Sequence, residues 1–120
     1  MIVSRRRFEV LVAEALDALP DDLAAAMDNV AVIVEDWPSD EQLAGTSEPL
    51  LGLYEGVALT ERSIFDTVRL PDRITLFRGP LCEIAHNEDD LVEQVLVTVV
   101  HEVAHHFGID DDRLDELGWG

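Results

Sequence analysis

The stretch NEDDLVEQVLVTVVHEVAHHFGIDD, residues 87–111, predicts one long helix around which the fold is built. It opens with Asn87, a side chain that caps helix N-termini, and three carboxylates follow in the first turn, where the helix dipole favours negative charge. Gly108 predicts the end of the helix. One half of the helical wheel is apolar and is expected to face the core: Leu91, Val92, Val95, Leu96, Val99, Val100, Val103 and Phe107.

A second, polar stripe runs along the opposite side of this helix and is expected to line a cleft: Gln94, Thr98, His101 and His105. Its end reads HEVAH, the HExxH pattern. Two imidazoles four residues apart lie one above the other, so both can bind one Zn²⁺, while Glu102 is turned by about 100° and can reach a metal-bound water. The alternative is that these side chains simply face solvent.

The pattern continues downstream as HExxHxxGxxD, ending at Asp111. A glycine at position 108 lets the backbone reverse through a positive φ, which brings a later residue back towards the histidines as a third ligand. Asp111 is placed for that role. The alternative is that the acidic residues 110–112 only cap a following helix. His106 falls within the apolar arc, which favours a hydrogen-bonded, half-buried histidine over a ligand.

The residues before this helix predict both helices and strands. Helical spacing predicts helices over 5–19 and, more briefly, over 23–27. Residues 30–34 are expected to form a buried strand, 50–59 an irregular or edge strand, and 74–78 a half-buried strand, whereas 38–49 predict a surface loop. The order of these elements favours an α+β fold, with helices packed against a small sheet in one domain over residues 1–120.

Composition excludes several classes of function. The 120 residues include 26 Asp and Glu against 8 basic residues, for a formal charge of -18. Such a surface repels phosphate backbones and anionic lipids, so neither nucleic acid nor membrane is expected as a partner. The longest uncharged apolar run, residues 95–100, is far shorter than a membrane span, and no signal peptide is recognised. The single cysteine, Cys82, fits a reducing compartment, and a cytoplasmic location is expected.

Residues 101–111, with Gly52–Gly56 and Leu70–Ile74 upstream, resemble the small bacterial zincin-like metallopeptidases, often described as minimal zincins. The resemblance spans most of residues 50–119. It implies a minimal zincin-like core, in which a small mixed β-sheet packs against the HExxH helix and an N-terminal helix. It further implies one Zn²⁺ per chain, held by His101, His105 and Asp111, with Glu102 as the catalytic base. The better-known metzincins have a third histidine where this chain has aspartate.

The function implied is hydrolysis of peptide bonds by a metal-activated water, with Glu102 as general base and a peptide or protein as substrate. Tyr54 and His86 are candidates to stabilise the oxyanion. The substrate is expected to add a strand to a sheet edge, offered by residues 74–78 or 51–57. Two alternatives remain: a non-catalytic metal-binding or regulatory module on the same fold, and a metal-dependent endoribonuclease, against which the negative charge argues.

Overall fold

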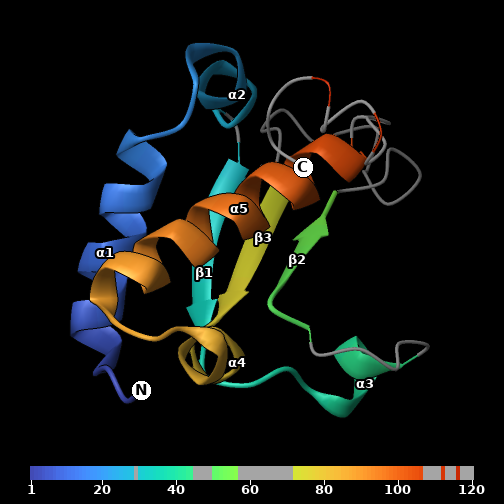
Figure 1. Cartoon of the computed structure of the whole chain (residues 1–120). Helices are drawn as coiled ribbons and strands as arrows, with labels where there is room; N and C mark the ends of the chain where they lie inside the picture. The colour runs from blue at the N-terminus through green and yellow to red at the C-terminus, as the bar shows by residue number, and fades with distance from the viewer. Residues whose placement is uncertain (29, 45–49, 57–71, 107–111, 113–115, 117–120) are drawn as a thin grey trace.

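The long helix α5 (Glu88–His106) is the central element of the chain (Figure 1). The computed structural model describes residues 1–28, 30–44, 50–56, 72–106, 112 and 116. The Asn87 side chain accepts a hydrogen bond from the backbone N–H of Asp90 at 2.8 Å, which confirms the predicted helix start. The predicted core-facing half of the helix is buried at Leu91, Val95, Val99, Val100 and Val103. Phe107 lies outside the described residues.

Helix α1 (Arg5–Asp17) packs beside α5 and completes the core. It begins where the sequence predicts, because the Ser4 hydroxyl accepts a hydrogen bond from the backbone N–H of Arg7. It ends two residues before the predicted boundary and is followed by the short helix α2 (Asp21–Ala26). Its buried face consists of Phe8, Leu11, Val12 and Ala15, which join the apolar side chains of α5 in one cluster. In the part of the chain that the structure describes, no helix is long and apolar enough to cross a membrane.

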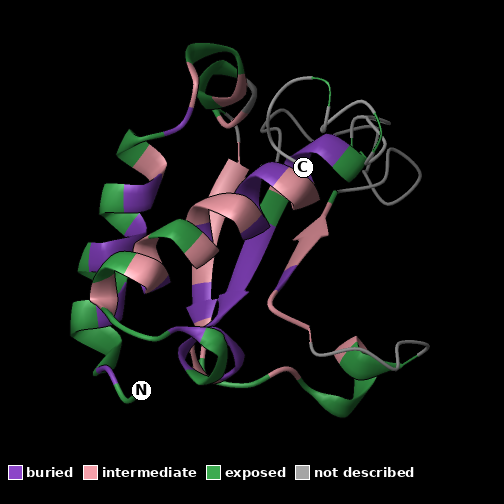
Figure 2. Cartoon of the chain, viewed as in Figure 1, coloured by how far each residue is buried: buried purple, intermediate pink, exposed green. Residues whose placement is uncertain are grey.

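Three strands form a mixed sheet within the described residues: β1 (Val30–Glu35), β2 (Gly52–Glu55) and β3 (Asp72–Phe77). Their order is β1-β3-β2, with β1 parallel and β2 antiparallel to β3. Helix α5 lies across one face of this sheet, and β3 beneath it is buried over most of its length (Figure 2). The predicted α+β fold, a small mixed sheet packed against the HExxH helix and an N-terminal helix, is confirmed.

The burial of two strands differs from the prediction. The strand at residues 30–34 was expected to be buried, but only Val34 is, because β1 lies at an edge of the sheet. The strand at 74–78 was expected to be half-buried, yet four successive residues, 74–77, are buried because β3 is flanked on both sides. The position of a strand in the sheet depends on which distant strands pair with it. The pattern of apolar and polar residues along one strand does not indicate whether that strand is central or at an edge.

Two short helices were not predicted. Helix α3 (Asp40–Leu43) lies in the segment expected to be a loop, and it begins with a capping box in which Ser39 and Gln42 bond each other's backbone N–H groups. Helix α4 (Arg78–Ile84) follows β3 directly. Pro80 lies in its first turn, where a missing N–H costs nothing. The pair Gly79-Pro80 therefore lies in the first turn of a helix that begins directly after the strand.

Gly52 is the point where β2 comes closest to α5. A Cβ built on Gly52 would lie 2.7 Å from Cγ2 of Thr98 and 3.2 Å from the carbonyl oxygen of Thr75. Both distances are shorter than ordinary van der Waals contact, so only a residue without a side chain permits this approach. The sequence predicts an irregular or edge strand here, in part because of this glycine. Packing at the sheet edge requires a glycine at this position.

We expect Gly52→Ala to destabilise the protein by about 1–3 kcal/mol, because the added methyl group forces β2 away from α5. Urea unfolding followed by circular dichroism measures this change. The double variant Gly52→Ala with Thr98→Ser removes the clashing Cγ2 and keeps the hydroxyl, which donates to the carbonyl of Gln94 at 2.8 Å. It should regain part of the lost stability. Equal stability of Gly52→Ala and the wild type would contradict the close packing.

Candidate active site

His101 and His105 share one face of α5 near its C-terminal end. Their ring centroids lie 6.1 Å apart and the ring planes make an angle of 52°. From this separation, rotation of the side chains can bring one nitrogen of each ring to a common ion, with bonds of about 2.0–2.1 Å. His101 is partly buried and His105 is exposed. The chemistry of this donor pair, two imidazoles one helical turn apart, fits a zinc ion.

Glu102 lies between the two histidines in sequence and is partly buried. Burial raises the pKa of its carboxyl group, an effect that outweighs the opposing influence of the neighbouring His105 and His101. A carboxylate with an increased affinity for protons is a better general base than one in open water. The environment of Glu102 thus suits a proton-transfer role beside the two imidazoles.

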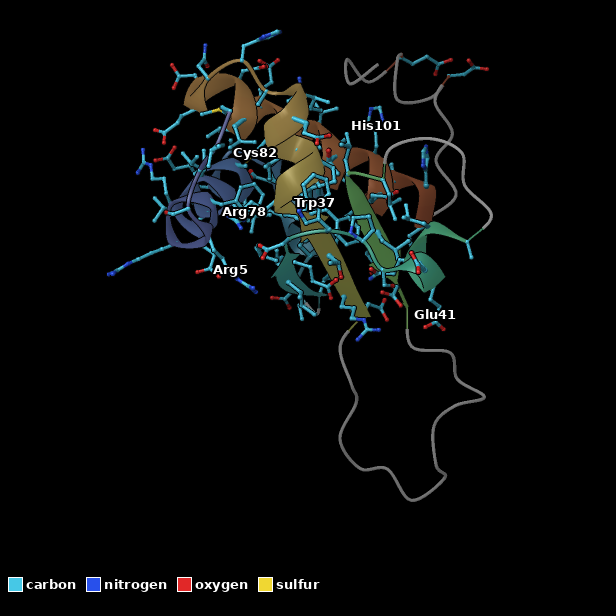
Figure 3. The ribbon with its side chains drawn as sticks, turned by 90° about the horizontal axis from the view of Figure 1, so that it is seen from below. Arg5, Trp37, Glu41, Arg78, Cys82 and His101 are labelled. Atoms are coloured by element: carbon cyan, nitrogen blue, oxygen red, sulfur yellow. The ribbon has the colours of Figure 1, made fainter. Side chains whose placement is uncertain are left out.

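A groove of about 310 Å³ opens beside these residues. We call it the active-site groove; it is lined on the strand side by Leu50, Leu51 and Gly52, and on the α5 side by Gln94, Val97, Thr98, His101 and Glu102. Figure 3 shows His101 on the ribbon of α5 close to β2. The polar stripe of α5 is predicted to line a cleft, and Gln94, Thr98 and His101 do so. His105, on the same stripe, is exposed and is not among the residues that line this groove.

A larger groove of about 450 Å³ lies at α3 and reaches β2 through Leu53 and Glu55. Glu41 of α3, which also lines this groove, is well separated from His101 in Figure 3. None of the residues lining the larger groove is a histidine or a cysteine. The smaller groove is the candidate active site because it joins His101 and Glu102 to an apolar wall.

Tyr54 and His106 belong to a contact network at the end of α5. The Tyr54 ring stacks on the His106 imidazole with centroids 4.0 Å apart, and the Tyr54 hydroxyl donates a hydrogen bond to Asp72 at 2.9 Å. Nε2 of His106 lies 3.7 Å from the same carboxylate, and the side chain of His106 is 35% exposed. Burial, followed by the hydrogen bond and the charge of Asp72, raises the pKa of Tyr54 to about 12. Sequence reasoning did not identify Asp72 as part of the site, because it is the first residue of β3 and is remote from the motif.

The second residue considered for the oxyanion, His86, lies at the wrong end of the helix. It precedes α5, and its backbone N–H donates to the carboxylate of Asp90 at 2.8 Å. With a rise of 1.5 Å per residue, the start of α5 is about 20 Å from His101. His86 therefore does not belong to the site, and the interpretation that included it was wrong.

The sheet order decides between the two edges considered for substrate binding. Residues 74–77 belong to β3, whose two sides are both paired, so this strand offers no edge. Within the described residues, β2 pairs with β3 alone, and its other side is an edge next to the active-site groove.

The third predicted ligand, Asp111, lies outside the described residues. Within the described part of the chain, no group of three or more metal-ligating side chains is found. The pair His101 and His105 is therefore the part of the expected ligand set whose geometry is known.

The chain belongs to the zincin-like metallopeptidase family, whose model it matches over residues 27–119. It is also similar to a solved structure described as a conserved hypothetical protein from Thermo thermophilus, with 27% sequence identity and a TM-score of 0.58. That alignment covers 96% of this chain and 97% of the other. A search of curated proteins gives no match. The family match confirms the resemblance found in the sequence.

Proposed function

We propose that this protein is a zinc-dependent peptidase whose ligands are His101, His105 and Asp111. The observation that carries the proposal is the pair of imidazoles with ring centroids 6.1 Å apart, beside the partly buried Glu102 and a groove next to a sheet edge. Membership of the zincin-like metallopeptidase family supports the same chemistry.

In this proposal the protein residues bind, orient and move a proton. Zinc, when bound, lowers the pKa of a water towards neutrality and polarises the carbonyl of the scissile bond. The Glu102 carboxylate takes a proton from the attacking water as the new C–O bond forms. It then delivers that proton to the amine nitrogen as the C–N bond breaks, so the carboxylate is regenerated.

The substrate is proposed to be an extended peptide that adds a strand to the edge of β2. Backbone N–H and C=O groups on the outer side of an edge strand are suited to pair with such a segment. Side chains of an extended peptide alternate between the two faces of the sheet, so those on the α5 side meet the active-site groove. The apolar wall of Leu50 and Leu51 favours apolar side chains there.

Replacing either His101 or His105 by alanine is expected to abolish stoichiometric zinc binding, because each removes one of the proposed protein ligands. His86→Ala is the matched control, since this histidine precedes α5 and lies about 20 Å from His101. At saturating zinc this variant should still bind one ion per chain. Elemental analysis after dialysis gives the metal content, and an equal loss in all three variants would contradict the assignment.

The third ligand is tested by Asp111→Asn, compared with Asp112→Asn. We expect the first change to weaken zinc binding by ~10-fold or more and the second to have little effect, because only Asp111 is at the position predicted for a ligand after the glycine. Competition with a chromophoric chelator measures both dissociation constants. If the two values do not differ, Asp111 is not the ligand.

Glu102→Gln separates metal binding from catalysis. Zinc affinity should stay nearly unchanged, whereas the rate of peptide cleavage should fall by about 10² to 10⁴, because the amide cannot accept the proton. A diverse library of unfolded and extended peptides, analysed by mass spectrometry, provides the substrates. If the zinc-loaded wild type cleaves nothing above the Glu102→Gln background, the non-catalytic metal-binding module becomes the better description.

A further inference from the structure

Three side chains from three elements meet at the last residue of α5. Tyr54 comes from β2, Asp72 is the first residue of β3, and His106 ends α5. We call them the Tyr54–Asp72–His106 cluster. No two of them are close in sequence, so their contacts tie the sheet to the end of the helix.

The contacts hold the imidazole of His106 from several directions. The Tyr54 ring covers one face, with centroids 4.0 Å apart and planes inclined by 24°. The Asp72 carboxylate faces Nε2 at 3.7 Å and is itself held by the Tyr54 hydroxyl at 2.9 Å. Gly56 closes a further side, since a Cβ there would lie 3.0 Å from Cε1 of His106. The position of this ring is thus defined by contacts with both strands.

The position of His106 along the helix connects these contacts to the active site. It follows His105 directly and lies one turn after Glu102, on the neighbouring part of the helix surface. The side chain of His105 is exposed, and the backbone that carries it belongs to the turn that ends in His106. The contacts of His106 with Tyr54 and Asp72 therefore fix the position of this turn relative to the strands.

We propose that the Tyr54–Asp72–His106 cluster is a positioning device that holds the last turn of α5, so that His105 and Glu102 keep the arrangement needed for metal binding. This inference rests on the proposed zinc site. It also gives Tyr54 a role different from oxyanion stabilisation, because its hydroxyl is engaged with Asp72.

The test is Tyr54→Phe, which removes the hydrogen bond to Asp72 and keeps the aromatic ring over His106. The matched control is Glu55→Gln, which weakens the 3.1 Å ion pair with Arg73. Glu55 and Arg73 are directly paired across the same two strands, one residue away from Tyr54. Any general effect of weakening contacts between β2 and β3 is therefore shared by the two variants.

Zinc affinity and the absorption spectrum of the Co²⁺-substituted protein are measured for both variants and the wild type. Contacts that orient metal ligands typically contribute 10–100-fold to affinity. We expect Tyr54→Phe to weaken zinc binding by about tenfold and to shift the Co²⁺ ligand-field bands, and Glu55→Gln to change neither. Asp72→Asn, which removes the charge facing His106, should act in the same direction and serves if Tyr54→Phe does not fold.

The possible outcomes separate this inference from the proposed function. If the wild type binds zinc and both Tyr54→Phe and Asp72→Asn bind it with the wild-type affinity and Co²⁺ spectrum, the cluster has no positioning role. The same conclusion follows if Glu55→Gln loses as much affinity as Tyr54→Phe. A wild type that binds no zinc contradicts the metal site itself, and the positioning role with it.

Discussion

The arrangement of the site depends on the close approach of β2 to α5. Gly52 meets Thr98 and Gly56 meets His106, so the strand and the helix touch at two places. Gly52 and Gly56 are four strand residues apart, a length of about 13 Å, and Thr98 and His106 are eight helix residues apart, a length of about 12 Å. Because the two lengths match and the contacts occur in the same order, the two elements run side by side in the same direction. Contact at Gly52 therefore also brings Tyr54 to the end of the helix, and the active-site groove lies between strand and helix.

Apolar packing of α5, α1 and β3 holds this arrangement in place, and exposed ion pairs contribute little to its stability. The core includes fully buried side chains from all three elements, among them Phe8, Ile74 and Val100. Two of the ion pairs found among the described residues, Arg7 with Glu88 and Arg5 with Glu9, join side chains that are about half exposed. Exposed pairs of this kind typically contribute about 0–1 kcal/mol each. The net charge of -18 favours the approach of cations.

The two faces of α5 have different roles: one packs in the core, and the other carries side chains of the proposed active site. The apolar half is buried against α1 and β3, which leaves the polar stripe, with Gln94, Thr98 and His101, beside the groove. The family match begins at residue 27, after α1, although α1 supplies four buried residues to the core. The elements that carry the proposed chemistry are α5 and the edge strand β2, and α1 contributes by fixing the helix from its other side.

The sequence by itself determined α5, its cap, its buried half and the facing of His101 into a groove, because these properties depend on residues within a few turns of one helix. It also predicted α1 and the α+β class. Only the tertiary structure decided that β3 is the central strand among the described residues, that β2 rather than β3 offers an edge beside the groove, that His86 is remote and that Asp72 joins Tyr54 and His106. The physical reason is that strand order and contacts between distant residues depend on which surfaces pack together, and a local pattern of apolar and polar residues does not specify a partner.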